Sequence, residues 1–403
     1  MSSSLVPRFP FLWILVLVPP LYFGCEWFTQ PEGRAEGSSD LGLYVRQTFD
    51  GGFILVGETT DPRAEFSDAW LIKTDSQGIE VWSRTYGGDA DDWGYTVQQS
   101  ADSGYMLVGS THSSGAGEAD IWLVKTDPDG VIEWEQTFGG AEHDYGYFVQ
   151  QATDGGYILA GETYSQGRGA SDVHVIKSDR EGNLLWEQTF GDSADDLGYA
   201  LCETSDRGFL ITGFTSIPGS GQEDLWVIRI DGAGGMQWER IYDTSFGGVG
   251  RSIQQTTDGN FAAAGFLRRG DSSYDFWLIK ADSAGNVLWD RTYGWNGDER
   301  AAAMQQTGDE GFILVGLTNS LGAGLNDIWL VKTDADGEPL WDQTYGGPSW
   351  DVGRSVQQTA DGGYILVGTT QSFGRDDSDV WLLKTDANGA VVWSQAFNHL
   401  TDN

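Results

Sequence analysis

Short apolar runs recur along the chain with a length that is typical of β-strands. Between residues 92 and 138 the runs are GYTVQQS, YMLVGST, DIWLVKTD and VIEWEQTF, all rich in β-branched and aromatic residues. No segment keeps the apolar period of 3.6 residues that an amphipathic helix requires. The pattern therefore predicts an all-β chain of short strands.

This group of four runs occurs seven times. A tryptophan in the third run recurs at spacings of 52, 52, 52, 51, 52 and 52 residues, with a histidine once in its place, and a second tryptophan follows twelve residues later each time. Such a period indicates seven equal structural units. The first series is Trp70, Trp122, His174, Trp226, Trp277, Trp329 and Trp381, and the second is Trp82, Trp134, Trp186, Trp238, Trp289, Trp341 and Trp393.

The connections predict how the strands pair. Asp-Gly turns such as DGG and DPDG join the first run to the second and the third to the fourth, which is typical of tight hairpins. The loops between the second and third runs, and between successive units, are longer. Each unit is therefore expected to be a four-stranded antiparallel meander, and all its long loops emerge on one side, which we name the long-loop face.

The apolar residues of the third run face both sides of the strand, so each unit needs a neighbour on either side. A closed ring provides these neighbours, whereas an open row would need polar capping units, and the first and last units are as apolar as the others. The sequence predicts a seven-bladed β-propeller over residues 40–403, with a repeat of about 52 residues. We expect the last blade to close the ring by packing its face on the first; a closing strand from residues 26–30 is the alternative.

The stretch DIWLVKTDADGEPLWDQTYGG at 327–347 resembles the repeat of the secreted seven-bladed propeller (SBBP-like) family, and the resemblance covers residues 40–397. It implies a seven-bladed propeller on an exported protein, usually without an assigned activity. The D-x-x-G-x-x-x-W part also resembles the tryptophan-docking motif of quinoprotein propellers, although it is one residue shorter. Their dehydrogenases usually have eight blades, so seven blades count against that identity. The strand layout is similar to kelch propellers, which carry a Gly-Gly pair where this chain has one glycine.

The N-terminus has the features of an export signal. Arg8 precedes an apolar run of fifteen residues at 9–23, which is shorter than the roughly 20 residues of a membrane span. Gly24-Cys25 then resembles a bacterial lipoprotein cleavage box, with aromatic residues at two of its positions. Lipidation at Cys25 and ordinary cleavage nearby are equal alternatives, and an uncleaved anchor is a third. We assign residues 1–25 to the leader and 26–39 to a flexible tether, and expect an extracellular, periplasmic or surface-anchored protein.

Charge excludes some partners. The chain has 23 Lys and Arg against 60 Asp and Glu, a net charge of −37, which repels nucleic acids and anionic lipid surfaces. Contact with a membrane is expected only through an N-terminal lipid or anchor. Cys25 and Cys202 do not form a disulfide framework, and Cys202 is expected to be a buried free thiol. No nucleophile elbow, HExxH motif or phosphate loop is present.

Residues that occur in every unit are expected to be structural. The third strand begins with an aspartate, a cation follows five residues later and a further aspartate two residues beyond, as in Asp68, Lys73 and Asp75. We expect the cation and the second aspartate to form an ion pair that anchors the turn.

Acidic residues also occupy one register just before the first strand of six units, with Gly248 in the remaining one. As a ring near the channel mouth they could hold a divalent cation, of which calcium is the candidate. The favoured interpretation is that each carboxylate accepts backbone N–H bonds within its own loop. The residues are Asp40, Asp92, Asp144, Asp196, Glu299 and Asp351.

Positions that differ between blades are the candidates for ligand binding. Three residues after the acidic register come Leu43, Tyr95, Tyr147, Tyr199, Arg251, Ala302 and Arg354, and Trp93, Trp295 and Trp350 lie nearby. Aromatic rings with arginines suit sugars, peptides or anionic groups. Packing of the tyrosines between blades is the alternative. The histidines His112, His143, His174 and His399 lie in different blades or the tail, without metal-ligand spacing.

These observations favour a non-enzymatic binding or scaffold propeller at the cell envelope. Its protein, peptide or glycan ligand would contact the long-loop face at the channel mouth, and no cofactor is expected apart from calcium. One alternative is a cation-dependent enzyme acting there on a polysaccharide or a quinone. Another is a purely structural surface or adhesion module.

Overall fold

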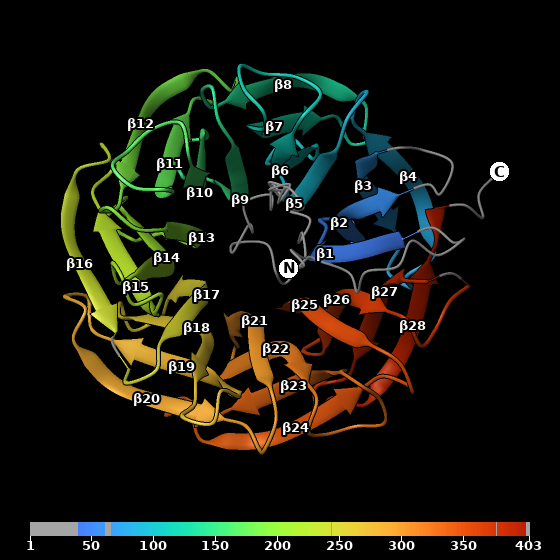
Figure 1. Ribbon diagram of the computed structural model, residues 1–403. Helices are drawn as coiled ribbons and strands as arrows, with labels where there is room; N and C mark the ends of the chain where they lie inside the picture. Colours follow the sequence, from blue (N-terminus) through green and yellow to red (C-terminus); the bar gives the residue numbers. More distant parts are fainter. Residues whose placement is uncertain (1–38, 61–65, 243, 376, 400–403) are drawn as a thin grey trace, which may run out of the picture. The chain divides into compact units, whose positions relative to one another are not determined.

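A computed structural model describes residues 39–60, 66–242, 244–375 and 377–399. This part of the chain contains β-strands and no α-helix, so it has no helix of the length and apolarity that crossing a membrane requires. The strands form seven four-stranded antiparallel sheets, each with its strands in chain order. Figure 1 shows these sheets as blades around a central axis, with the first strand of each innermost. The protein is a seven-bladed β-propeller, as predicted.

The strands occupy four equivalent places in the blades. The innermost are β1 (Ser39–Gln47), β5 (Asp92–Gln99), β9 (Asp144–Gln151), β13 (Asp196–Glu203), β17 (Gly248–Gln255), β21 (Glu299–Gln306) and β25 (Asp351–Gln358). The second strands are β2 (Phe53–Thr60), β6 (Tyr105–Thr111), β10 (Tyr157–Thr163), β14 (Phe209–Ser216), β18 (Phe261–Arg268), β22 (Phe312–Thr318) and β26 (Tyr364–Thr370). The third strands are β3 (Ser67–Thr74), β7 (Asp120–Thr126), β11 (Asp172–Ser178), β15 (Glu223–Ile230), β19 (Tyr274–Ala281), β23 (Asp327–Thr333) and β27 (Asp379–Thr385). The outermost are β4 (Glu80–Tyr86), β8 (Ile132–Phe138), β12 (Leu184–Phe190), β16 (Met236–Tyr242), β20 (Val287–Tyr293), β24 (Pro339–Tyr345) and β28 (Val391–Phe397).

Three sequence predictions fall outside the described residues. They are the leader at 1–25 with its lipidation site Cys25, the tether at 26–39 apart from Ser39, and the alternative closing strand at 26–30.

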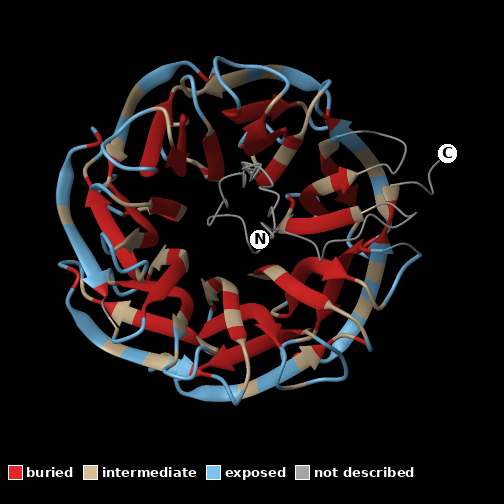
Figure 2. Cartoon of the chain, viewed as in Figure 1, coloured by how far each residue is buried: buried red, intermediate tan, exposed pale blue. Residues whose placement is uncertain are grey.

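The hydrophobic core lies between adjacent blades. One cluster joins Ile54 and Leu71 of the first blade to Leu107 and Trp122 of the second, and similar clusters follow around the ring. Figure 2 shows buried residues concentrated in the inner three strands and exposed residues along the outermost ones. Burying one indole contributes about 2–3 kcal/mol, so the tryptophans repeated in the third strand account for much of the packing between blades.

His174 takes the place of the third-strand tryptophan in blade 3 without loss of its polar contact. In other blades the indole Nε1 of this tryptophan donates to a carboxylate on the outermost strand, as Trp122 does to Glu135 at 3.1 Å. The Nε2 atom of His174 lies 3.1 Å from the corresponding carboxylate of Glu187, and the imidazole is fully buried. The histidine is therefore a packing variant, which agrees with its position in the repeat.

The ring closes through the same contacts that join the other blades. A core cluster containing Val45 and Trp70 of blade 1 also contains Leu382 of blade 7, which confirms closure by face packing. The backbone N–H of Asp40 donates to the Ser378 carbonyl at 3.0 Å, as Asp351 does to Asn326 at 2.9 Å.

A ring of side-chain hydrogen bonds accompanies this packing. In each blade a residue at the end of the innermost strand accepts a backbone N–H from the turn of the preceding blade, at 2.7–3.1 Å. The pairs are Phe49 to Gln99, Ala101 to Gln151, Thr153 to Glu203, Ser205 to Gln255, Thr257 to Gln306, Gly308 to Gln358 and, at closure, Ala360 to Gln47.

The repeated cations do not pair with the aspartate predicted for them. Lys73 lies opposite Ile54 across the sheet, which places its ammonium at the turn between the first and second strands, 2.9 Å from Asp50. Asp75 instead accepts the N–H groups of its own turn, at Gln77 and Ile79. The equivalent pairs are Lys125–Asp102, Lys177–Asp154, Arg229–Asp206, Lys280–Asp258, Lys332–Asp309 and Lys384–Asp361.

Closure predicts that a variant at the junction of blades 7 and 1 behaves like one at an internal junction. Gln47→Ala and Gln358→Ala each remove the acceptor of one turn N–H, so each is expected to lower the free energy of unfolding by about 0.5–1.5 kcal/mol. Urea unfolding followed by tryptophan fluorescence measures both. A lower free energy of unfolding for Gln358→Ala with an unchanged one for Gln47→Ala would contradict the closed ring.

Candidate functional site

A β-bulge places the blade-specific residue of each innermost strand. In blade 2 the register shifts between Gly94 and Thr96, so Tyr95 has no partner in the ladder. The glycine of the second strand makes this possible, because a Cβ on Gly109 would lie 1.6 Å from the carbonyl oxygen of Trp93. The recurring glycine of the repeat is therefore a requirement of the bulge. The bulge residues are Leu43, Tyr95, Tyr147, Tyr199, Arg251, Ala302 and Arg354.

Four of the predicted ligand-binding residues form one continuous row along the inner strands of blades 2–5. The rings of Tyr95 and Tyr147 have centroids 5.3 Å apart, and Tyr147 and Tyr199 are also 5.3 Å apart. The guanidinium carbon of Arg251 lies 3.9 Å from the centre of the Tyr199 ring, a cation–π geometry. We name Tyr95, Tyr147, Tyr199 and Arg251 the Tyr–Arg arc.

Arg354 adds a second cation close to this arc. Burial, together with the positive charge of Arg251, lowers the pKa of the Arg354 guanidinium to about 9. Both effects penalise the charged form, and a nearby anion would oppose them by favouring it. The bulge positions of blades 5 and 7 therefore form a cationic region within a strongly acidic protein.

A buried carboxyl that the sequence interpretation missed lies behind the arc. Tyr147 donates a short hydrogen bond from its hydroxyl to Oε1 of Glu162, which is 1% exposed. Burial is the largest cause that raises the pKa of Glu162 to about 7, against the opposing effect of the Tyr147 hydrogen bond. One sequence feature could have revealed this carboxyl. A glutamate follows the second-strand glycine in blades 1 and 3 alone, in the tripeptide Gly-Glu-Thr at 57–59 and 161–163.

Two aromatic side chains meet further along the inner strands, one residue beyond the bulge. The rings of Tyr44 in blade 1 and Phe148 in blade 3 lie edge to face, with centroids 6.0 Å apart. The intervening blade carries the smaller Thr96 at this position, which leaves room for the contact. Aromatic groups thus bridge non-adjacent blades on the side of the arc away from the long-loop face.

The six acidic residues proposed as a calcium ring each bond within their own surroundings. Asp92, for example, accepts the Gly88 N–H at 2.7 Å and the Ser113 hydroxyl at 2.6 Å, and Asp40 accepts the His399 N–H at 3.0 Å. Within residues 39–399, as far as they are described, no three metal-ligating side chains come together. The structure does not gather these carboxylates into one site, and calcium stays a prediction of the sequence. The set is Asp40, Asp92, Asp144, Asp196, Glu299 and Asp351.

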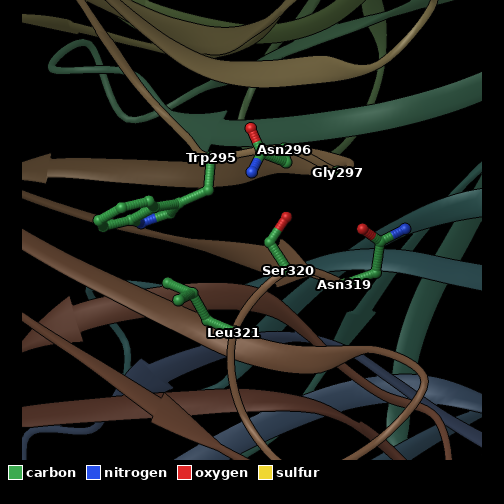
Figure 3. Close-up of a pocket in the computed structure, with 6 residues that line it drawn as sticks. All are labelled: Trp295, Asn296, Gly297, Asn319, Ser320 and Leu321. Carbon is green, nitrogen blue, oxygen red and sulfur yellow. The ribbon is translucent and has the colours of Figure 1, made fainter.

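The three predicted tryptophans lie at separate places on the long-loop face. Trp93 stacks on Tyr145 with centroids 6.2 Å apart and meets His112 edge to face at 5.1 Å, in a cluster that includes His143. Trp350 is half-buried and its backbone pairs with Asn326, just before β23 of blade 6. Trp295 is 59% exposed and borders a hollow of about 400 Å³, shown in Figure 3.

Cys202 is a half-buried free thiol in the inner strand of blade 4. Burial raises the pKa of this thiol to about 12, so the thiolate is scarce at neutral pH. The side chain replaces a glutamine of the repeat and has no features of a nucleophile.

Comparisons with known proteins identify the fold and do not identify a family. No family model matches the chain, so the SBBP-like relationship remains a resemblance. The regulatory protein FlaEY of Caulobacter vibrioides is 24% identical over 259 residues, which are 58% of this chain but 27% of FlaEY.

Solved propellers align over most of the chain at low identity. The β-propeller domain of the Trilobed protease from Pyrococcus furiosus, which has an open velcro topology, gives a TM-score of 0.51 at 8% identity, covering 92% of this chain and 98% of that one. A puromycin hydrolase mutant gives 0.54 at 12% identity, covering 90% and 55%. The Pan2 WD40 domain of Neurospora crassa gives 0.50 at 12% identity, covering 84% and 87%. These similarities support the propeller architecture alone.

The buried carboxyl predicts a pH-dependent effect. Because the folded-state pKa of Glu162 lies above its ordinary value of 4.5, its contribution to stability is fully present below pH 4.5 and is lost as the pH rises through about 7. Glu162→Gln stays neutral and keeps an acceptor for Tyr147. The free energy of unfolding of Glu162→Gln is therefore expected to rise above that of the wild type as the pH increases from 4.5 to about 7. At the upper end of this range the difference is expected to be on the order of 1–3 kcal/mol.

Denaturant unfolding at several pH values measures this difference. Glu181→Gln, at an exposed carboxyl in the turn after β11, is the control and is expected to follow the wild type. A difference between Glu162→Gln and wild type that stays constant with pH would contradict the assignment.

Proposed function

We propose that this chain is a non-enzymatic binding or scaffold propeller of the cell envelope. Its ligand presents an anionic group to Arg251 and Arg354 while it contacts the rings of the Tyr–Arg arc. The single observation that carries the proposal is the row of tyrosine rings ending in Arg251, 3.9 Å from Tyr199.

The position of the arc supports this role. Residues that repeat in all blades are used in packing and in hydrogen bonds between blades, whereas the bulge residues differ from blade to blade along the innermost strands. Tyr95 and Tyr147 are only 8% and 5% exposed, whereas Tyr199, Arg251 and Arg354 are half-buried, so a ligand reaches the row from its Tyr199–Arg251 end. Loops and irregular positions on a rigid scaffold commonly carry function. Arg251 and Arg354 place two positive charges near one another, and a carboxylate or similar anion is favoured beside such a pair.

Export is supported by the N-terminal sequence. The apolar run at 9–23 followed by Cys25 fits a leader peptide, with or without lipidation. The similarity to FlaEY, a protein described as regulatory, fits a role in binding rather than catalysis, although the matched part is a minority of that protein.

The alternative of a cation-dependent enzyme has less support. It requires a set of metal ligands beside an acid–base pair, and each of the six acidic residues forms hydrogen bonds with groups in its own surroundings, as Asp40 does with His399. Glu162 has the raised pKa of a possible general acid, but it is buried behind Tyr147 rather than open to a substrate.

Removing the two cations is expected to weaken the binding of an acidic ligand. The probes are oligogalacturonates and glutamate-rich peptides, each compared with its uncharged methyl ester, titrated calorimetrically into the purified protein. We expect preferential binding of an acidic probe, and a loss of about tenfold or more in Arg251→Gln/Arg354→Gln.

A matched pair of charge removals provides the control. Arg240 and Arg291 lie over Trp238 and Trp289 on outer strands, with 5.5 Å between each guanidinium carbon and its ring. Arg240→Gln/Arg291→Gln is expected to bind like the wild type. Equal binding of acids and esters, no binding of either, or an equal loss in both double variants would overturn the proposal.

A further inference from the structure

The hollow beside Trp295 lies between blades 5 and 6 on the long-loop face, and none of its lining residues belongs to the Tyr–Arg arc. It is lined by Trp295, Asn296 and Gly297 of the loop before β21 and by Asn319, Ser320 and Leu321 of the loop after β22. Figure 3 shows the indole at one side and the amides and the hydroxyl at the other.

A substitution in the repeat explains why this junction is open. The position of Trp295 is a glycine at the junctions that contain Gly88, Gly140 and Gly347. In each of these the glycine packs against a serine, and an added Cβ would lie 2.6 Å from the serine Cβ. An indole does not fit there, so Trp295 projects to solvent and leaves space above Ser320.

The hydroxyl of Ser320 is released from the bond that its counterparts make. At other junctions the serine donates to the acidic residue of the register, as Ser113 does to Asp92 at 2.6 Å. Here the acidic residue is Glu299. It accepts hydrogen bonds from the Trp295 N–H and the Thr318 hydroxyl, both at 2.9 Å, and none from Ser320. Among the residues that the structure describes, Ser320 Oγ then has no hydrogen-bond partner.

The neighbouring Asn319 is held in place and keeps a side-chain donor for a ligand. Asn319 accepts the Asp298 N–H through Oδ1 at 2.8 Å, and its own N–H donates to the Asp298 carbonyl at 3.1 Å, so its Nδ2 is left for a ligand. Gly297 keeps the space clear, because a Cβ there would lie 2.0 Å from Asn319 Oδ1 and 2.6 Å from Ser320 Oγ.

The backbone of the loop is also fixed. Arg269 donates to the Trp295 carbonyl and pairs with Asp275 at 3.3 Å, and the Trp295 N–H is held by Glu299. The indole is thus an exposed ring on an anchored loop, which lowers the entropic cost of binding a ligand against it.

We propose that this hollow binds a neutral hexopyranose unit of a glycan. The apolar C–H face of a pyranose ring stacks on the Trp295 indole, while Asn296, Asn319 and Ser320 offer amides and a hydroxyl to the sugar hydroxyls. No charged side chain lines the hollow among the described residues, so the site suits a neutral sugar rather than the anion proposed for the arc.

The test uses cellohexaose and chitohexaose as probes of the purified protein, by saturation-transfer NMR and calorimetry. At least one probe is expected to bind, with affinity reduced about tenfold or more in Trp295→Ala, which corresponds to about 1.4 kcal/mol. Gly297→Ala, which fills the hollow while keeping the indole, is expected to weaken binding as well.

Phe246→Ala is the control, because Phe246 is a 52% exposed aromatic residue in the loop of the preceding junction. Phe246→Ala is expected to bind the oligosaccharides like the wild type. Arg251→Gln/Arg354→Gln is also expected to bind them like the wild type, so the test of the hollow does not depend on the outcome of the anion proposal. Absence of binding by both saccharides, or unchanged binding by Trp295→Ala, would overturn the inference.

Discussion

Each blade of this protein depends on its neighbours, because a four-stranded sheet with two apolar faces has no stable surroundings of its own in water. The core is divided into clusters that each span two blades, and the cluster holding Val45 and Leu382 closes the ring as the others do. The bond from Ala360 to Gln47 repeats at this junction what the other blades do at theirs. Cooperativity of the whole ring follows, since loss of one interface exposes two blade faces at once.

This constraint separates structural from functional positions. The third-strand tryptophans, the second-strand glycines and the cation of each blade serve packing, the bulge and the turn, so they recur, with His174 as the one replacement among the tryptophans. The bulge residue is released from the ladder and can differ between blades without loss of pairing, which explains how Leu43, Tyr147 and Arg354 occupy one position. The junction loops have the same freedom, and Trp295 uses it.

The sequence was sufficient for the blade number, the strand order and the grouping of the bulge residues, because a strict period transfers one assignment to all units. It was insufficient where the partner of a residue comes from another segment. Lys73 appeared paired with Asp75 by its spacing along the strand, whereas antiparallel pairing brings it to Asp50. The contact of Glu162 with Tyr147 and the meeting of Tyr44 with Phe148 depend on the bulge and on blade curvature, which no spacing encodes.

The two proposed sites differ in how they relate to the charge of the whole molecule. A net charge of −37 repels an anion at distances up to a Debye length, about 8 Å at physiological salt, whereas the proposed contact with Arg251 and Arg354 would act at hydrogen-bond range. An acidic ligand would therefore be slowed in its approach and bound only by a short-range contact with the arginines. A neutral sugar at Trp295 experiences neither effect, so its recognition depends on stacking and hydrogen-bond geometry. Together, one rigid ring can present two chemically distinct sites because the packing between blades leaves both sets of positions free to vary.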